Sequence, residues 1–309
     1  MTAENVVVAT GSRPAVPPID GLEECDYLTS NEALYLTDPP ESLVVLGGGY
    51  IAVELGYVFG SIGTDVTIIE KNDSLVSRED GAVAATLTEI ASDRHEVHTG
   101  HRVTAVEALG DGYRVHAETE AGGTIAVDGE EVLVTLGRRP NTDVLNLETA
   151  GIEVDDRGFI ETNEYLETSA ENVWAQGDVA GNALFKHAGD YETRHVIDNV
   201  VDDERRALAL SAMPHAIFTE PQIAGVVGRA EYADSAMGRA KKLDDGFVKV
   251  RAAPDGEILD CHVIGYEASM LVHEAVVAMR VGATVDEVAD TIHAVRAGCT
   301  DAITEKLVT

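Results

Sequence analysis

The pattern of hydrophobic and polar positions changes along the chain between short apolar runs and longer runs with helical spacing. An apolar run at 42–49 ends in three glycines, an apolar helix is predicted at 50–63, and a second buried strand at 65–70. Gly60 and Gly63 suit the end of that helix. Together these segments predict one complete β-turn-α-β unit, so we expect an α/β fold.

Further elements are predicted before this unit. A short apolar run at 5–9, followed by a Thr-Gly turn, is typical of a buried strand. Three prolines in 13–21 indicate a loop. Helical spacing at 30–36 predicts a helix with Ser30 as its N-cap.

The elements predicted after this unit reach to the C-terminus, without an internal repeat or a low-complexity stretch. In chain order they are a helix at 81–93, antiparallel strands within 102–118 and 122–130 followed by a buried strand at 131–137, a loop at 138–143, a strand and Gly-Asp turn at 172–181, a helix at 184–201, three strands at 216–228, 246–252 and 257–265, and helices at 269–282 and 284–295.

Length and composition indicate a globular protein. The 309 residues, 45% of them hydrophobic, are enough for roughly two domains with packed cores. No apolar run is long enough to cross a bilayer, and the N-terminus lacks the features of a signal peptide, so we expect a cytoplasmic protein with no membrane partner. Cys25, Cys261 and Cys299 form no C-x-x-C pair. We expect reduced thiols, buried or partly buried, and no metal site.

Acidic residues greatly outnumber basic residues. The chain has 55 Asp and Glu against 22 Lys and Arg, for a net charge of −33. We expect no nucleic-acid partner, because phosphate binding needs basic patches. Repulsion among so many negative charges destabilises a compact state at low salt. At 1 M salt the Debye length is only about 3 Å, so this repulsion is screened. We therefore hypothesise a halophilic source.

The glycine turn "GGGYIAVELG" carries the clearest chemical signal. Gly47, Gly49 and Ala52 fit the G-x-G-x-x-G/A pattern, with Gly48 between the two glycines. Gly47 permits a tight turn, Gly49 lets a pyrophosphate approach the backbone, and Ala52 lets the helix pack on the strand. The helix N-terminus then offers N–H groups to the phosphates. The preceding strand and following helix favour a dinucleotide site over a turn that only packs.

Glu70 ends the second strand, where an acid would accept a hydrogen bond from a ribose 2′-hydroxyl. A carboxylate there repels a 2′-phosphate, so we predict NAD rather than NADP. Lys71 and Arg78 could soften this preference, although solvated surface charges are the favoured interpretation of both.

Five segments in fixed order carry a family resemblance: "VVVATGSRP", "GGGYIAVELG", "EVLVTLGRRPN", "VWAQGDVAG" and "LFKHA". The chain resembles the class I pyridine nucleotide-disulfide oxidoreductases, which include dihydrolipoamide dehydrogenase and the glutathione, mycothione and mercuric reductases. "MPHAIFTEPQIAGVVG" looks like the start of that family's dimerisation domain. The resemblance covers essentially the whole chain and implies FAD and NAD as cofactors and a homodimer.

The resemblance also implies roles for single residues. The residues implied at FAD are Ala9, Thr10, Gly11, Gly177, Asp178, Lys186 and His187. Asp178 would hold the ribityl chain, although capping of the following turn is an alternative. For Lys186 and His187, an exposed helix face is an equal alternative. The residues implied at NAD, beside those of the turn, are Tyr50, Glu54, Glu70, Val103, Gly137 and Arg138.

The sequence departs from the family pattern in two places. It contains neither a first glycine turn for FAD nor the C-x-x-x-x-C pair that exchanges electrons with the flavin. In the C-terminal pattern H-x-H-P-x-x-x-E the second His is the acid-base group, and Val295 stands there, two positions after His293. We predict no catalytic residue in this stretch, because valine cannot carry a proton and His293 lies several ångströms away on extended backbone. Cys299 is interpreted as incidental.

The expected fold is α/β, with a three-layer, Rossmann-like NAD domain inserted in a partial FAD domain and followed by an α+β dimerisation domain. The expected boundaries are 1–40 and 134–206 for the FAD domain, 41–133 for the NAD domain and 207–309 for the dimerisation domain. The partial FAD domain should leave an exposed sheet edge and apolar surface.

Three functions remain open. The first is a flavin-dependent NAD oxidoreductase of the disulfide-reductase type. The second is a non-catalytic or partner-dependent dinucleotide-binding remnant, which would complement a separate N-terminal half. The third is a flavoprotein that passes hydride to quinone or oxygen without a thiol step.

Overall fold

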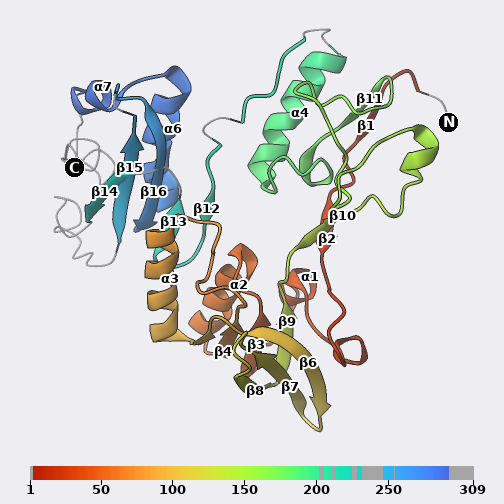
Figure 1. Ribbon diagram of the computed structural model, residues 1–309, viewed down its shortest axis with the longest axis vertical. Helices are drawn as coiled ribbons and strands as arrows, with labels where there is room; N and C mark the ends of the chain where they lie inside the picture. Colours follow the sequence, from red (N-terminus) through yellow and green to blue (C-terminus); the bar gives the residue numbers. More distant parts are fainter. Residues whose placement is uncertain are drawn as a thin grey trace. The chain divides into compact units, whose positions relative to one another are not determined.

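The computed structural model describes residues 3–201, 205–210, 213–224, 228–231, 246–253 and 255–291, without the side chains of 228–231 and 289. The chain divides into two compact units, and each is described by itself. The first consists of Met1–Ala15 and Gly137–Met213, and the second of Val16–Leu136 and Pro214–Thr309. Figure 1 labels the helices and strands, which form the mixed α/β fold that the hydrophobic pattern predicts. Within the described residues, no helix combines the length and apolar character that crossing a membrane requires.

In the first unit, two chain segments that are far apart in sequence form one small sheet. Strand β1 (Val6–Val8) pairs in parallel with β11 (Val173–Ala175), and Val6 lies opposite Val173. The chain then enters the short helix η3 (Gly177–Val179), while helix α4 (Lys186–Val200) packs close by. The pairing therefore brings the end of β1 next to the Gly-Asp turn.

The structure of the first unit differs from the sequence-based prediction at three segments. The run at 5–9 is a strand but not a buried one: Val6 and Val7 are 45% and 43% exposed, because β11 is the only described strand beside β1. The start of the loop predicted at 13–21 belongs to a short strand, β2 (Ser12–Pro14), and the loop predicted at 138–143 contains another, β10 (Arg138–Pro140). These segments pair antiparallel, an arrangement that Arg and Pro residues do not indicate locally. The exposed valines agree with the expected apolar surface.

In the second unit, the predicted β-turn-α-β segment forms the centre of a three-layer domain. Its parallel sheet has the order β5-β4-β3-β9, and a separate antiparallel sheet has the order β6-β7-β8. The elements are η1 (Leu22–Glu24), α1 (Ser30–Ala33), β3 (Ser42–Leu46), α2 (Tyr50–Ser61), β4 (Asp65–Ile69), α3 (Gly81–Arg94), β5 (Glu96–His98), β6 (Arg102–Leu109), β7 (Gly112–Glu118), β8 (Thr124–Gly129) and β9 (Glu131–Val134).

Strand β3 shows why this domain has three layers. Its residues Leu43 and Val45 belong to a buried cluster with side chains of α2 and α3. Its residues Val44 and Leu46 belong to a second cluster, with side chains of β6 and β7. Because successive side chains of a strand point to opposite faces, a strand covered on both faces needs a continuous apolar run. The three-layer expectation is confirmed.

Helix α1 differs from its prediction at both ends. Its N-cap is Thr29 rather than Ser30, and Glu32 closes the capping box by accepting a hydrogen bond from the Thr29 N–H (2.9 Å). The helix ends at Ala33, and Leu34 and Tyr35 beyond it are 71% and 86% exposed. The apolar spacing therefore overstated the length of the helix.

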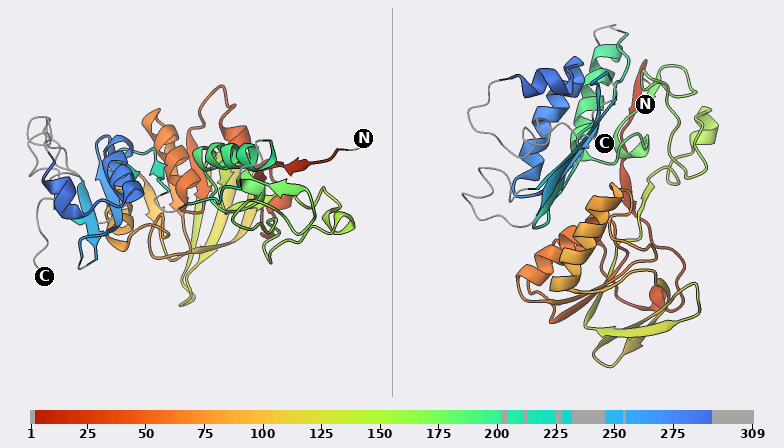
Figure 2. Two further views of the ribbon diagram at one scale, coloured as in Figure 1. Left: turned by 90° about the horizontal axis from the view of Figure 1, so that it is seen from above. Right: turned by 60° about the vertical axis from the view of Figure 1, so that its left-hand side comes forward.

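The C-terminal part of the second unit is a five-stranded antiparallel sheet covered by helix α6 (Ala268–Val281) (Figure 2). Its strands are β12 (Ala216–Ile217), β13 (Gln222–Ala224), β14 (Gly228–Glu231), β15 (Phe247–Ala252) and β16 (Ile258–Gly265). The prediction of three strands was wrong because the segment 216–228 is not one strand: the turn before β13 divides it, so β12 and β13 pair with each other. Helix α7 (Val285–Ala289) follows, and 292–295 lie outside the described residues.

The two faces of this sheet belong to different cores. Phe247 and Ile264 join the cluster that contains α2 and α3, whereas the neighbouring Val248 and Val263 join the cluster of α6. Apolar burial of this kind contributes roughly 25 cal/mol per Å². Within the second unit, the C-terminal sheet and the glycine-turn domain therefore share one apolar core.

Candidate functional site

The glycine turn lies between the end of β3 and the start of α2, as predicted. Gly47 has φ = +106°, and a Cβ atom there would lie 2.9 Å from the carbonyl oxygen of Thr135. The Gly47 N–H donates to the carbonyl of Ile69 on the neighbouring strand (2.8 Å). Only glycine fits this position, because the backbone is in the left-handed region and is tightly packed.

Gly49 has a different environment. Its backbone is extended (φ = −78°, ψ = −172°), and among the described residues, apart from its two chain neighbours, no atom lies within 4 Å of the position a Cβ would take. The open space lies at the N-terminus of α2, where free N–H groups and the helix dipole attract a phosphate. Ala52, one turn later, is completely buried against the sheet side of the helix. The geometry therefore fits the pyrophosphate of a dinucleotide, because any side chain larger than that of Gly49 would fill this space.

Glu70 holds the turn in shape. Its buried carboxylate accepts hydrogen bonds from the Gly48 N–H (2.5 Å) and from the N–H and side-chain amide of Asn72 (2.8 and 2.5 Å). A carboxylate offers about four acceptor positions. The Glu70 carboxylate, which is predicted to bind the ribose, therefore also stabilises the turn. One of its acceptor positions stays available for a further donor.

A buried polar cluster joins α2 to the C-terminal sheet. The Glu79 carboxylate, whose side chain is 1% exposed, accepts hydrogen bonds from the Tyr50 hydroxyl and from His215 Nε2 (2.9 and 3.0 Å). The rings of Tyr50 and His215 are parallel, with centroids 6.1 Å apart. His262 Nδ1 lies 3.8 Å from Glu79 Oε2, a distance that is too long for a hydrogen bond.

This environment lowers the pKa of Glu79 and raises the pKa of Tyr50. Burial alone would raise the pKa of Glu79, but the neighbouring His215, His262 and Tyr50 outweigh it and lower that pKa to about 2. Burial, followed by the contact with Glu79, raises the pKa of Tyr50. Glu79 is therefore a buried anion and Tyr50 a neutral hydrogen-bond donor.

Glu79 and His215 were not predicted from the sequence. Glu79 lies in the charged stretch "SRED", which resembles a solvated surface, and His215 is 136 positions away. One local signal was present, because Asp80 is the N-cap of α3 and accepts from the Ala82 N–H (3.0 Å). Its other oxygen binds Lys249 Nζ of β15 (2.6 Å), a second link to the C-terminal sheet.

Glu54, predicted beside Tyr50, contacts the same sheet. Its Oε1 accepts a hydrogen bond from the Phe218 N–H (2.8 Å), next to the end of β12. Burial raises the pKa of this carboxyl, and the Phe218 hydrogen bond partly opposes the rise. Its assignment to NAD stays a prediction.

In the first unit, Asp178 follows Gly177 at the turn after β11, as expected. Its Oδ2 accepts from the Ser12 hydroxyl and lies 3.6 Å from Arg138 Nε. Arg138 also donates to the Ser12 hydroxyl (2.8 Å) and carbonyl (2.9 Å). Gly11 and Gly177 have φ values of +70° and +72°, and in the part of the chain that the structure describes no atom beyond their chain neighbours lies within 4 Å of either missing Cβ. The two glycines leave their backbone open to the close approach of another group.

Glu192 was missed by the sequence analysis. This completely buried residue of α4 accepts from the Gly177 N–H (2.5 Å) and from the Asn182 amide (3.1 Å). Burial raises its pKa, against the effect of these two hydrogen bonds. Its contact with Gly177 braces the turn that presents Asp178.

The other predicted residues are less informative. Ala9 and Thr10 are exposed, and Lys186 pairs with Asp190 (2.6 Å) on the exposed face of α4, beside the exposed His187. Val103 packs partly buried beside the core under β6 and β7. His293, Val295 and Cys299 lie outside the described residues. Cys25 and Cys261 are buried and form no disulfide among the described residues, and their burial agrees with the expectation for these two.

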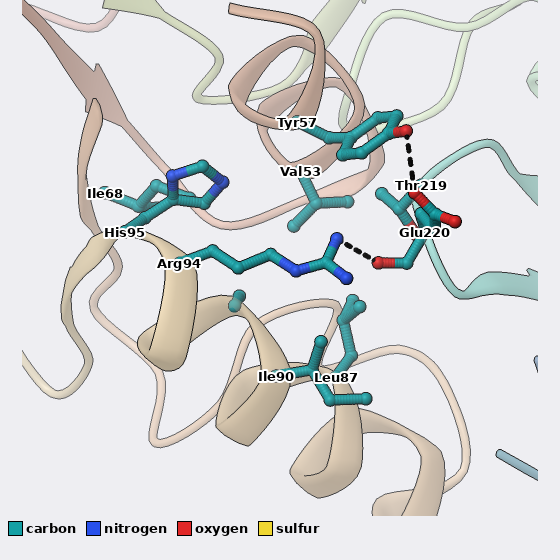
Figure 3. Close-up of a pocket in the computed structure, with 10 residues that line it drawn as sticks. Val53, Tyr57, Ile68, Leu87, Ile90, Arg94, His95, Thr219 and Glu220 are labelled. Atoms are coloured by element: carbon teal, nitrogen blue, oxygen red, sulfur yellow. Dashed lines mark hydrogen bonds between the residues drawn. The ribbon is translucent and has the colours of Figure 1, made fainter. Parts of the chain in front are cut away.

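A separate small pocket lies between α2, α3 and the turn before β13 (Figure 3). Arg94 donates to the Glu220 carbonyl across it, and the Tyr57 hydroxyl lies 3.2 Å from Glu220 Oε2. Most of its lining is apolar, including Val53 and Leu87, and no lining residue is in the predicted cofactor set. We assign the pocket no part in cofactor binding.

Two protein-family models match the chain. Pyridine nucleotide-disulphide oxidoreductase matches residues 1–212, and the dimerisation domain of the same family matches residues 218–296. Together they cover both the glycine turn and the C-terminal sheet.

Similar proteins and structures agree. The chain is 37% identical to dihydrolipoyl dehydrogenase of Halobacterium salinarum, over 94% of this chain and 65% of that protein. It is 35% identical to mycothione reductase of Mycobacterium tuberculosis, over 93% of this chain and 66% of that protein. The chain thus spans about two thirds of the length of these relatives. The structure of LpdA from Mycobacterium tuberculosis is similar with a TM-score of 0.86 at 25% identity, covering 99% of this chain and 70% of that one.

Proposed function

The chain belongs to the pyridine nucleotide-disulphide oxidoreductase family, and from this premise we propose that it takes part in hydride transfer between NAD(H) and FAD. The observation that carries the proposal is the open space at Gly49, at the N-terminus of α2 and beside the Glu70 carboxylate. Such a site binds a pyrophosphate through backbone N–H groups. The proposed enzyme resembles dihydrolipoamide dehydrogenase.

The residues have separate roles in this proposal. Gly47, Gly49 and the first turn of α2 bind the NAD pyrophosphate, and Glu70 binds the adenosine ribose and disfavours the 2′-phosphate of NADP. In the first unit Thr10, Gly11 and Asp178 contact FAD, with Asp178 oriented by Ser12 and Arg138. When bound, FAD supplies the centre that accepts a hydride from the nicotinamide.

We assign no thiol acid-base group to this chain. Val295 stands where the family pattern has its acid-base His, and the sequence contains no C-x-x-x-x-C pair. The exposed Val6 and Val7 of β1 favour an alternative, in which a separate N-terminal half covers this strand and completes the flavin site. The proposed domain boundaries remain 1–40, 41–133, 134–206 and 207–309, with homodimerisation through the last segment.

The function is tested by adding FAD and then NADH anaerobically to the purified chain and recording its visible spectrum. Flavin that stays with the protein through gel filtration and is bleached by NADH supports the oxidoreductase. A chain that binds NADH but retains no flavin supports the partner-dependent alternative. A chain that binds neither nucleotide contradicts the proposal.

We further expect stability to depend on salt. The net charge of −33 should repel itself in dilute buffer and be screened when the Debye length falls from about 10 Å at 0.1 M to about 3 Å at 1 M salt. Thermal unfolding should therefore shift to higher temperature as potassium chloride is raised across this range. An unchanged midpoint would contradict the halophilic interpretation.

A further inference from the structure

The polar cluster around Glu79 lies at the edge of the glycine turn. Tyr50 is the first residue of α2 and follows Gly49 directly, so its backbone borders the open space at the helix N-terminus. Its hydroxyl donates to the Glu79 carboxylate, which lies in the loop before α3. The direction of the Tyr50 side chain is therefore set by a residue that belongs neither to the turn nor to α2.

Glu79 is itself fixed from the C-terminal sheet. Both of its oxygens lie within hydrogen-bond distance of His215 Nε2, directly before β12, and His262 of β16 lies beside it. A buried carboxylate with charged or polar partners has a defined position, because leaving it without them costs several kcal/mol. The chain of contacts thus runs from the C-terminal sheet through Glu79 to Tyr50.

We propose that Glu79 is a positioning residue that, held by His215, fixes Tyr50 beside the dinucleotide turn and so makes the C-terminal domain part of the dinucleotide site. The expected effect on nucleotide binding rests on the proposed NAD-binding function, whereas the contact between Glu79 and Tyr50 does not. The Tyr50 ring, held by its hydroxyl and faced by the parallel His215 ring, is preorganised for one bound geometry. Release of the hydroxyl should free the ring and weaken nucleotide binding.

Helix α2 offers a matched control. Tyr57, two turns after Tyr50, lies near another carboxylate, that of Glu220, but this contact is exposed. Tyr35, which is 86% exposed, reports the intrinsic rate of any tyrosine reagent. The three tyrosines allow the Glu79 contact to be separated from general loosening of the fold.

The test is nitration by tetranitromethane of the full-length chain, with each modified tyrosine assigned by tandem mass spectrometry. In the wild type Tyr50 should react far more slowly than Tyr35. In E79Q and in H215F, which keeps a ring but removes the donor to Glu79, nitration of Tyr50 should rise about tenfold, the usual effect of losing one hydrogen bond to a charged group. E220Q should leave Tyr50 unchanged. Equal nitration of Tyr50 in the wild type, E79Q and H215F would overturn the proposal.

NADH affinity gives the second measurement. Y50F and E79Q should each weaken NADH binding about three- to tenfold, and the double variant should be no weaker than E79Q, since both changes break one contact. Additive losses would overturn the positioning role. If Tyr50 shows the predicted nitration pattern but the wild type binds no NADH, the proposed function fails while the positioning of Tyr50 stands.

Discussion

Replacing Gly47 with alanine is expected to lower the free energy of unfolding by about 3 kcal/mol. Two effects combine. At φ = +106° an L-residue is strained, and the added Cβ would lie 2.9 Å from the carbonyl oxygen of Thr135, a backbone atom that cannot rotate away. Urea unfolding at fixed high salt measures the change.

The control is the corresponding change two residues later. G49A places a Cβ into open space on an extended backbone, so its stability should stay within about 1 kcal/mol of the wild type, the cost of an altered N-cap. Equal unfolding midpoints for G47A and the wild type would show that the turn is not constrained as described.

Removing the charge of Glu79 should destabilise the chain in a way that depends on pH. The pKa of this buried carboxyl is lowered from 4.5 to about 2, so the folded state favours its ionised form. The resulting stabilisation, roughly 3 kcal/mol, is complete above pH 4.5 and is lost as the pH falls towards 2. E79Q, which cannot ionise, should lack this part of the pH dependence.

The measurement compares thermal or urea unfolding of the wild type and E79Q at several pH values, again at fixed salt. The difference in stability should be large at pH 7 and should shrink below pH 4.5. Because other acids titrate in both proteins, their contributions largely cancel in the difference. A difference that stays constant down to the acid limit would contradict the assignment of a buried ionised Glu79.

Much of the fold could be predicted because local patterns determine it. The apolar strands at 42–49 and 65–70 and the helix between them follow from residues that are adjacent in sequence, and their structure agrees with the prediction. The short strand β10 could not be found this way. Its residues pair with β2, more than 120 positions away, and neither segment is apolar. The N-cap of α1 was missed by one residue because Thr29 and Ser30 are both good caps.

The site was predicted in part for the same reason. The roles of Gly47, Gly49 and Ala52 follow from one short motif, and each finds a matching environment. The roles of Glu79 and Glu192 depend on partners brought by the tertiary fold, His215 and the Gly177 N–H. An isolated Glu in a polar stretch carries no sign that it will be buried.

The central claim is that the turn at the start of α2 binds NAD(H). Its most direct test is a titration with NADH, followed by nucleotide fluorescence, of the wild type and G49A side by side. We predict saturable binding to the wild type and about 10- to 100-fold weaker binding to G49A, because the added methyl group fills the space proposed for the pyrophosphate. Equal affinity of the two proteins, or no binding by the wild type, would contradict the claim.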